Sequence, residues 1–381
     1  MERKNIYICM LAALLSCSDS VKVSRTLDEM PVIFPDYNGV VVPPNIAPLN
    51  FALNGQDAGS CAVFSFGGQQ FEVKGEKGGF VIPPSKWKKL LESAAGNSIQ
   101  VTVQVKQGNE WVAYSPFTIQ VAAEKIDSYL AYRLIDPGYE LWNKMGIYQR
   151  DLESYTQTPI IENKMSGNNC VNCHSFCMQS PDKMLFHMRE TFPGTILVDG
   201  DKIEKLNTKT KETISSLVYP SWHPSGKYVA FSVNTTKQAF HLNDKNRVEV
   251  YDEASDVVVY DVEKHEIVTA STIFSKDAFE TFPTFSPDGK TLYFCTAEAR
   301  PIPQEYSEVK YNLCSISFDP ATRTFGTQVD TLYNAKSGGM SASFPRVSPD
   351  GRYLLYTLSG YGNFSIWHKD ADLYMTDLQT G

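Results

Sequence analysis

The sequence is poor in the features that mark nucleic-acid-binding proteins, membrane-spanning proteins and familiar enzymes. It carries 35 lysines and arginines against 43 aspartates and glutamates, a net charge of −8, with no basic block, which argues against nucleic acid as a partner. After residue 15 no apolar run is long enough to span a bilayer. We find no nucleophile elbow, phosphate loop, His-Glu-x-x-His motif or carboxylate pair in a defining context. The sequence therefore identifies no catalytic residue and favours neither a hydrolase nor a transferase.

Against this background one short motif is chemically specific. Histidine is scarce, with 6 in 381 residues, yet one of them completes the stretch Cys170-Val-Asn-Cys173-His174. Cys-x-x-Cys-His is the spacing that attaches haem through two thioethers, because two such cysteines can reach both vinyl groups on one porphyrin edge. The histidine that follows falls beneath the iron and can serve as an axial ligand. The motif predicts a covalently bound haem c at residues 170–174, with His174 on the iron.

Three other interpretations of the motif stay open. Cys170, Cys173, His174 and Cys177 could together bind zinc, whose structural sites use four such ligands. The first two cysteines could form a redox-active pair, although the surrounding sequence reads as β-structure rather than the βαβ unit typical of such pairs. They could also be structural cysteines in a loop.

The sequence does not fix a sixth iron ligand. His187 is the nearest histidine along the chain, but a hydrogen-bonded core or surface histidine is the commoner role for such a residue. Met165, Met178, Met184 and Met188 also lie nearby, and we expect them to serve in packing. A six-coordinate haem would favour electron transfer, whereas an open sixth position would permit gas binding or peroxide chemistry.

Residues 1–17 read as an export signal. Arg3 and Lys4 precede a short apolar run over residues 6–15, which is too short to form a stable membrane span. The run ends in Leu-Leu-Ser-Cys17, which resembles a bacterial lipobox and implies lipid on Cys17; an ordinary signal peptide with a chance cysteine is the alternative. A lipid would anchor the chain to a membrane of the cell envelope, in the periplasm or at the outer membrane. Export places the motif cysteines in an oxidising compartment, where bacteria attach c-type haem.

The segment after the signal divides into a tether and a β domain. Residues 18–30 are polar, and residues 31–124 alternate polar and apolar side chains in short runs such as Gln100-Val-Thr-Val-Gln-Val, with Gly, Asn and Pro between them. One short amphipathic helix is expected over residues 87–95. This pattern predicts a β-sandwich of immunoglobulin or fibronectin type, which would act as a spacer or packing module or bind carbohydrate or a partner.

The rest of the chain is repetitive. Phe282-Pro-Thr-Phe-Ser-Pro-Asp-Gly recurs with small changes from Tyr219 and from Phe344, and each copy reads as strand, turn and strand. A third strand follows in each unit, and two weaker copies precede the clear ones. We expect propeller blades near residues 126–165, 168–217, 218–280, 281–342 and 343–381. Cys295 and Cys314 fall in two predicted strands of one blade, where they could pair or remain buried thiols.

These units resemble the blades of TolB-like β-propellers, a WD-type repeat. With the signal and the haem motif, the whole resembles exported propeller lipoproteins of Bacteroides-type bacteria. The resemblance implies an all-β chain with a sandwich followed by a six-bladed propeller, and the sequence ends inside the fifth blade, so we expect an incomplete ring. It implies a fold and no activity.

Aligning the repeats puts His174 on the innermost strand of the second blade, near one mouth of the channel. The leading hypothesis is a lipid-anchored propeller whose haem c transfers electrons or senses redox state, with a redox or envelope protein as partner. The alternative is a TolB-like envelope scaffold without haem, whose cysteines are structural or bind zinc. An enzyme acting on envelope glycans or peptides has only the versatility of the fold in its favour.

Overall fold

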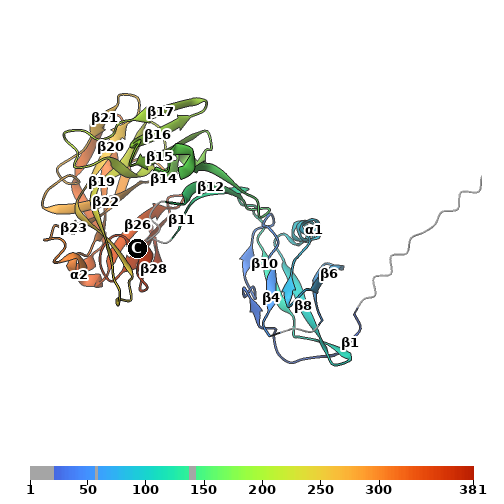
Figure 1. Ribbon diagram of the computed structural model, residues 1–381. Coiled ribbons are helices and arrows are strands. Elements are labelled where there is room, and N and C mark those ends of the chain that lie inside the picture. Colours follow the sequence, from blue (N-terminus) through green and yellow to red (C-terminus); the bar gives the residue numbers. More distant parts are fainter. Residues whose placement is uncertain (1–20, 56–58, 137–142) are drawn as a thin grey trace, which may run out of the picture. The chain divides into compact units, whose positions relative to one another are not determined.

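The computed structural model describes residues 21–55, 59–136 and 143–381. The expected signal peptide and Cys17 lie outside these residues. Among the described residues, no helix is long and apolar enough to cross a membrane. The chain is all-β and forms two compact units, one of Met1–Leu130 with Gln149–Thr158 and one of Ala131–Tyr148 with Pro159–Gly381 (Figure 1).

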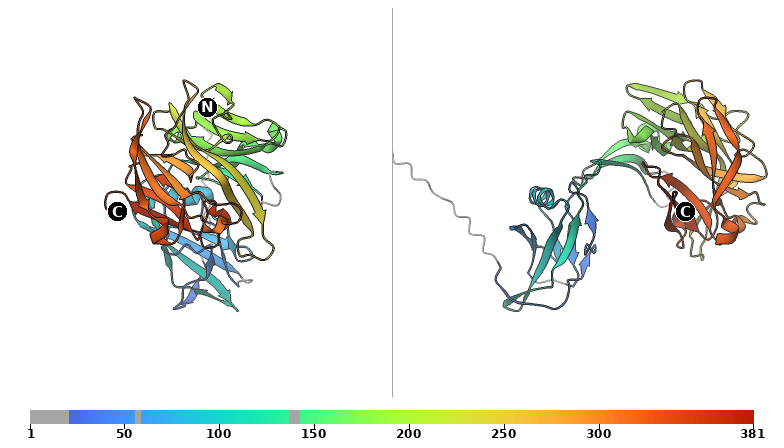
Figure 2. Two further views of the ribbon diagram at one scale, coloured as in Figure 1. Left: turned by 90° about the vertical axis from the view of Figure 1, so that its left-hand side faces the viewer. Right: turned by 180° about the vertical axis from the view of Figure 1, so that it is seen from behind.

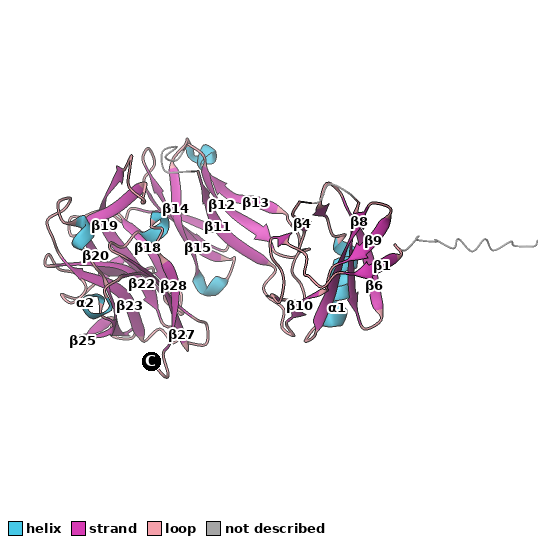
Figure 3. Ribbon diagram, turned by 90° about the horizontal axis from the view of Figure 1, so that it is seen from below, coloured by secondary structure: helices cyan, strands magenta, loops and turns pink. Residues whose placement is uncertain are grey.

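The first unit packs two sheets and one helix around a single core. Strand β8 (Ser98–Gln107) buries Ile99, Val101, Val103 and Val105 in strict alternation, which is what a half-buried strand requires. Helix α1 (Pro84–Ala94) lies beside the strands of this unit (Figure 3) and begins with proline, which suits a first turn. Its buried residues Trp87, Leu90 and Leu91 pack in the same core as the strands. The strands of this unit form two sheets. The larger sheet contains β1 (Val23–Thr26), β3 (Val41–Val42), β5 (Ser60–Phe66), β6 (Gln69–Gly75), β8, β9 (Glu110–Ala113) and β10 (Phe117–Val121). The smaller sheet contains β2 (Ile33–Phe34), β4 (Phe51–Leu53) and β7 (Gly79–Phe80). The assignment of this unit to the immunoglobulin or fibronectin type stays a prediction.

The second unit, whose first sheet has strands that extend into residues belonging to the first unit, is built from sheets that follow one another along the chain (Figures 1 and 2). They are β11 (Tyr129–Ile135), β12 (Met145–Asp151) and β13 (Gln157–Glu162); β14 (Cys170–Phe176), β15 (Lys183–Arg189), β16 (Gly194–Asp199) and β17 (Lys202–Leu206); β18 (Leu217–Trp222), β19 (Tyr228–Phe240), β20 (Val248–Asp261) and β21 (Glu266–Val268); β22 (Ala278–Phe285), β23 (Thr291–Glu298), β24 (Asn312–Asp319) and β25 (Thr324–Tyr333); and β26 (Ser341–Val347), β27 (Tyr353–Ser359) and β28 (Asp372–Asp377). The first strands β14, β18, β22 and β26 lie next to one another in that order, with a hydrophobic core between successive sheets. This is the arrangement of propeller blades.

The repeated turn shows why its sequence recurs. Between β22 and β23 the Ser286 hydroxyl accepts the Thr291 N–H at 3.0 Å, and the Gly289 N–H donates to the Ser286 carbonyl at 2.9 Å. Gly289 has φ +73°, a conformation that glycine adopts without strain. Strands β22 and β26 begin at Ala278 and Ser341, slightly before the expected blade limits at 281 and 343, because the Phe-Pro pair that marks each repeat lies within its strand.

The possible pairing of Cys295 with Cys314 is wrong. Both are free, buried thiols. Cys295 packs in the core that β23 shares with β26 and β27, whereas Cys314 packs in the core on the other side of its sheet, with Val257 and Phe285. Two side chains on opposite faces of one sheet cannot reach each other to form a disulfide.

Candidate functional site

The haem motif forms strand β14, the first strand of its sheet. Its ladder with β15 is interrupted between Asn172 and Ser175, and Cys173 at the interruption has φ +52°. A left-handed conformation costs a non-glycine residue about 1 kcal/mol or more, so the surrounding structure must impose it.

The same bulge recurs in the three sheets that follow. Tyr219, Phe282 and Phe344 have φ of +49°, +51° and +52°, and each lies where the ladder of its first strand is interrupted. A proline follows each of these aromatic residues. The structure therefore aligns Cys173 with the three aromatic residues and His174 with the three prolines.

The aromatic residues at this level contact one another across neighbouring blades. The ring centroids of Tyr219 and Phe282 are 4.8 Å apart, and those of Phe282 and Phe344 are 4.2 Å apart. The Cys173 thiol lies close enough to raise the pKa of the Tyr219 hydroxyl, after the larger effect of burial. Cysteine brings much less volume than an aromatic ring, so β14 contributes the least side-chain bulk to this layer.

The motif cysteines have different surroundings. Cys170 is 7% exposed and packs with Met145, Ile147 and Phe186, and burial raises the pKa of its thiol. Cys173 is half-buried, and both are free thiols. Cys177 packs in a separate core, so the side chains of the zinc hypothesis are not brought together. Within the described parts of the chain, no three His, Cys, Asp or Glu side chains are grouped to hold a metal ion.

The surroundings of His174 suit an axial ligand. Its ring is half-buried, and burial lowers its pKa and so favours the neutral form. A hydrogen bond to the backbone of Ala131 raises the pKa, as expected where a ring N–H donates to a carbonyl oxygen. Such a bond orients the imidazole and leaves its second nitrogen with a free lone pair, which is the support that metal-ligating histidines usually receive.

The other candidate iron ligands differ in how far their side chains are buried. His187 lies opposite Asn172 in the ladder, is 3% exposed, and has Nδ1 at 3.3 Å from the Thr195 hydroxyl. Burial lowers the pKa of His187 to about 4, so this ring is neutral at physiological pH. Of the methionines, Met165 and Met178 are exposed, whereas Met184 and Met188 pack in the core.

Two arginines beside the motif were not anticipated from the sequence. Arg133 on β11 donates from Nη1 to the Asn172 side chain at 2.8 Å, between the two cysteines. Arg189 on β15 lies directly opposite Cys170 in the ladder. No sequence motif links either arginine to the cysteines. Arg133 lies on β11, in another sheet than β14, and Arg189 lies on β15, which a turn separates from β14.

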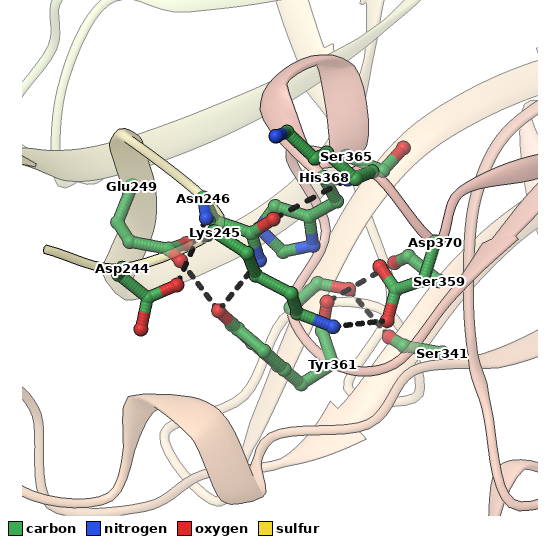
Figure 4. A network of polar contacts seen from close by, with 12 residues as sticks. Asp244, Lys245, Asn246, Glu249, Ser341, Ser359, Tyr361, Ser365, His368 and Asp370 are labelled. Carbon is green, nitrogen blue, oxygen red and sulfur yellow. Dashed lines mark hydrogen bonds and ion pairs between the residues drawn. The ribbon is translucent and has the colours of Figure 1, made fainter.

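A buried polar network also escaped sequence reasoning. Strands β19 and β20 continue as a long hairpin whose end contacts the loop between β27 and β28 (Figure 4). His368 Nε2 donates to Glu249 Oε2 at 2.9 Å, the Tyr361 hydroxyl donates to the other Glu249 oxygen, and Lys245 pairs with Asp370 at 3.4 Å. Because Glu249 and His368 are 2% and 6% exposed, this contact ties the hairpin to the last sheet.

Three further carboxyl groups are buried, those of Asp252 and Asp256 on β20 and of Glu280 near the start of β22. Asp252 accepts from the side-chain amides of Asn234 and Asn363 at 2.7 and 2.6 Å, and burial raises its pKa to about 7. Glu280 has one oxygen at 3.5 Å from the Ser275 hydroxyl, and its other oxygen has no side-chain hydrogen-bond partner among the described residues. Burial, followed by the charge of Asp256, raises the pKa of Glu280 to about 8.

Comparison with known proteins adds no family assignment. No protein-family model matches the chain, and no curated protein matches it. Among solved structures, the Cps50 (Swd1) β-propeller domain of Myceliophteria thermophila is 11% identical over 74% of this chain and 78% of its own, with a TM-score of 0.36. A DUF4784 family protein from Bacteroides caccae is 7% identical over 91% and 95%, with a TM-score of 0.34. Porphyromonas gingivalis dipeptidyl peptidase 4 is 11% identical over 90% and 45%, with a TM-score of 0.35. Such values carry no argument about function.

Proposed function

We propose that this chain is an exported, lipid-anchored β-propeller that carries a c-type haem on Cys170 and Cys173, with His174 as an axial ligand. It would transfer electrons or sense redox state in the cell envelope, working with a redox or envelope protein. A bound haem would supply one-electron chemistry at its iron.

The observation that carries the proposal is the presence of a cysteine in place of an aromatic residue at the repeated bulge. Three blades use the bulge to place an aromatic residue and a proline, as at Phe282 and Pro283, and the second blade uses the same backbone to place Cys173 and His174. A purely structural blade would gain more packing from the aromatic residue, since a buried ring contributes far more contact area than a thiol. The cysteine at this position is explained if a flat, apolar group attached to Cys173 fills the space that an aromatic ring fills in the other blades.

The burial of Cys170 determines when, relative to folding, a haem could be attached. Its thiol faces Met145 and Ile147 in the folded sheet and cannot be approached by a reagent the size of a porphyrin. Thioether formation on Cys170 must therefore precede closure of this sheet. Once the haem is attached, its edge would join the apolar core that Cys170 now shares.

The test is the intact mass of the protein secreted by a host that matures c-type cytochromes. We expect the mass to increase by one haem, and the increase to disappear in the double variant Cys170→Ala and Cys173→Ala. Cys61→Ala, a buried cysteine of the first unit, is the matched control and should retain the increase. An unmodified wild-type protein, beside a control cytochrome that acquires haem, would refute the proposal.

One observation favours a second candidate function. Cys170 and Cys177 each pack in an apolar core, as structural cysteines do. The chain would then be a TolB-like envelope scaffold without haem, whose propeller face binds a protein or glycan. Under this alternative Cys170→Ala and Cys177→Ala destabilise the fold, and no variant changes the mass beyond the substitution itself.

A further inference from the structure

The smaller sheet of the first unit turns an apolar face outward. Ile33 and Leu53 are buried in the core, so the residues that alternate with them along β2 and β4 face away from it. The ladder pairs Phe34 with Ala52 and Ala52 with Gly79, which makes one row across β2, β4 and β7. The central row of the outward face therefore carries no charge.

Large apolar side chains extend this row. Met30 and Val32 precede Phe34 at alternate positions, and the Asn54 N–H donates to the Val32 carbonyl at 3.0 Å, so the pairing continues past the end of β2. Val81 directly follows β7. The side chains of Met30, Val32, Phe34 and Val81, which we call the apolar patch, are 51%, 67%, 70% and 75% exposed. Large apolar side chains that gather on a surface mark a place where a protein or a membrane binds.

The charged residues near the apolar patch are of both signs. Glu76 and Lys77 lie just before β7, Asp36 lies two residues after β2, and Lys86 lies near the start of α1. Because positive and negative charges are mixed here, an association of this face would be driven by burial of apolar surface rather than by attraction between charges. We therefore expect it to respond little to salt.

The length of chain before the first unit limits what can cover the apolar patch. The proposed lipid lies on Cys17, and only residues 18–20 separate it from Val21, the first described residue. Even when fully extended, the chain from Cys17 to Val21 spans at most about 14 Å, and the chain from Val21 to Met30 adds at most about 30 Å. A lipid in a bilayer therefore keeps the first unit at the membrane surface, where the effective concentration of that surface is high.

We infer that the apolar patch binds the surface of the bilayer that holds Cys17, with its four side chains buried at the boundary between headgroups and acyl chains. The inference rests on the lipid-anchored part of the proposed function and is independent of the haem. Apolar side chains that enter this boundary strengthen the attachment of a lipid-modified protein, because each removes apolar surface from water. The first unit would then be a second membrane anchor as well as a spacer.

The experiment compares two forms of the full mature chain. One carries its lipid and is reconstituted in vesicles of phosphatidylethanolamine and phosphatidylglycerol, and the other begins at residue 18 and stays in solution. Val32→Cys and Val81→Cys place thiols on the apolar patch, and Thr118→Cys is the matched control, because Thr118 is an exposed residue on the outward face of the larger sheet. Peptide mapping measures how fast a water-soluble maleimide modifies each new cysteine.

We expect both patch cysteines to react about tenfold more slowly on vesicles than in solution, because water-soluble reagents do not enter the acyl boundary. Thr118→Cys should react at the same rate in both forms. The protection of the patch cysteines should persist at high ionic strength, and protection that disappears there would contradict an apolar contact.

Equal rates for the patch cysteines in the two forms would overturn the inference. Slow reaction in the lipid-free chain that becomes faster on dilution would also overturn it, because a second copy of the chain would then cover the patch. A mass that shows no lipid on Cys17 would refute the proposed anchoring instead. In that case sedimentation of the lipid-free chain with the same vesicles tests the patch: binding that is lost in Val32→Asp supports the inference, and absence of binding overturns it.

Discussion

Cys173 and Phe282 occupy equivalent places in strands β14 and β22, each at the bulge of a first strand, with φ of +52° and +51°. The backbone of the propeller thus provides this position in four blades, and the residue there is aromatic in three of them and a cysteine in the fourth. Because the position is imposed by the fold, the identity of its side chain can change without rebuilding the sheet.

The aromatic layer makes a direct prediction about stability. Phe282→Ala should destabilise the propeller unit by about 3 kcal/mol, since the ring is 2% exposed and contacts both Tyr219 and Phe344. Phe282→Gly should be no worse than Phe282→Ala, because glycine adopts a left-handed φ without strain. Urea unfolding curves of the three proteins test both points. If the glycine variant is the weaker by about 1 kcal/mol, as in an ordinary strand, the bulge conformation is refuted.

The cysteines of the haem-free protein should differ in reactivity. Cys173 is the half-buried thiol of the motif, whereas Cys170, Cys177, Cys295 and Cys314 are buried. A thiol reagent added to the folded, reduced protein should therefore modify Cys173 first. Peptide mapping by mass spectrometry identifies the modified residue, and Cys173→Ser should abolish the fast phase. Modification of Cys170 at the same rate would contradict the packing described for β14 and the required order of haem attachment.

The contact between the long hairpin and the last sheet should be strongly coupled. Removing one partner of the buried Glu249–His368 pair leaves the other without this hydrogen bond, and we expect Glu249→Ala or His368→Ala to cost roughly 3 kcal/mol. The double variant should cost much less than the sum of the two. A double-mutant cycle by denaturant unfolding measures this coupling, and Lys245→Ala, in an exposed ion pair, is the control with an effect below about 1 kcal/mol. Additive effects would show that the pair does not hold the hairpin.

Glu280 should make stability fall as pH rises. Its carboxyl group loses its proton near the ordinary pKa of 4.5 in the unfolded chain and near about 8 in the folded protein. Between these values the folded state binds more protons, so raising the pH favours unfolding, by up to about 1.4 kcal/mol per pH unit. Glu280→Gln removes this contribution, and its stability relative to the wild type should increase from acidic to mildly alkaline pH. Parallel stability curves for the two proteins would contradict the raised pKa of the Glu280 carboxyl group in the folded state.

The sequence predicted those parts of the structure that rest on local rules. The repeated Ser-Pro-Asp-Gly turn and the alternating strands identified the propeller sheets, because turn geometry is set by residues close in the chain. The same alignment placed His174 on a first strand. The sequence could not show that Cys295 and Cys314 lie on opposite faces of a sheet, since a shift of one residue in register reverses the face. Nor could it bring Arg133 to Asn172, because that contact depends on how two sheets pack.

The measurement that tests the central claim most directly is the visible absorption spectrum of the secreted protein before and after acid-acetone extraction. A covalent haem on Cys170 and Cys173 predicts a Soret band that stays with the protein after extraction and is absent from the variant lacking both cysteines. A wild-type protein with no Soret band, or with a band that is removed entirely by extraction, would contradict covalent attachment.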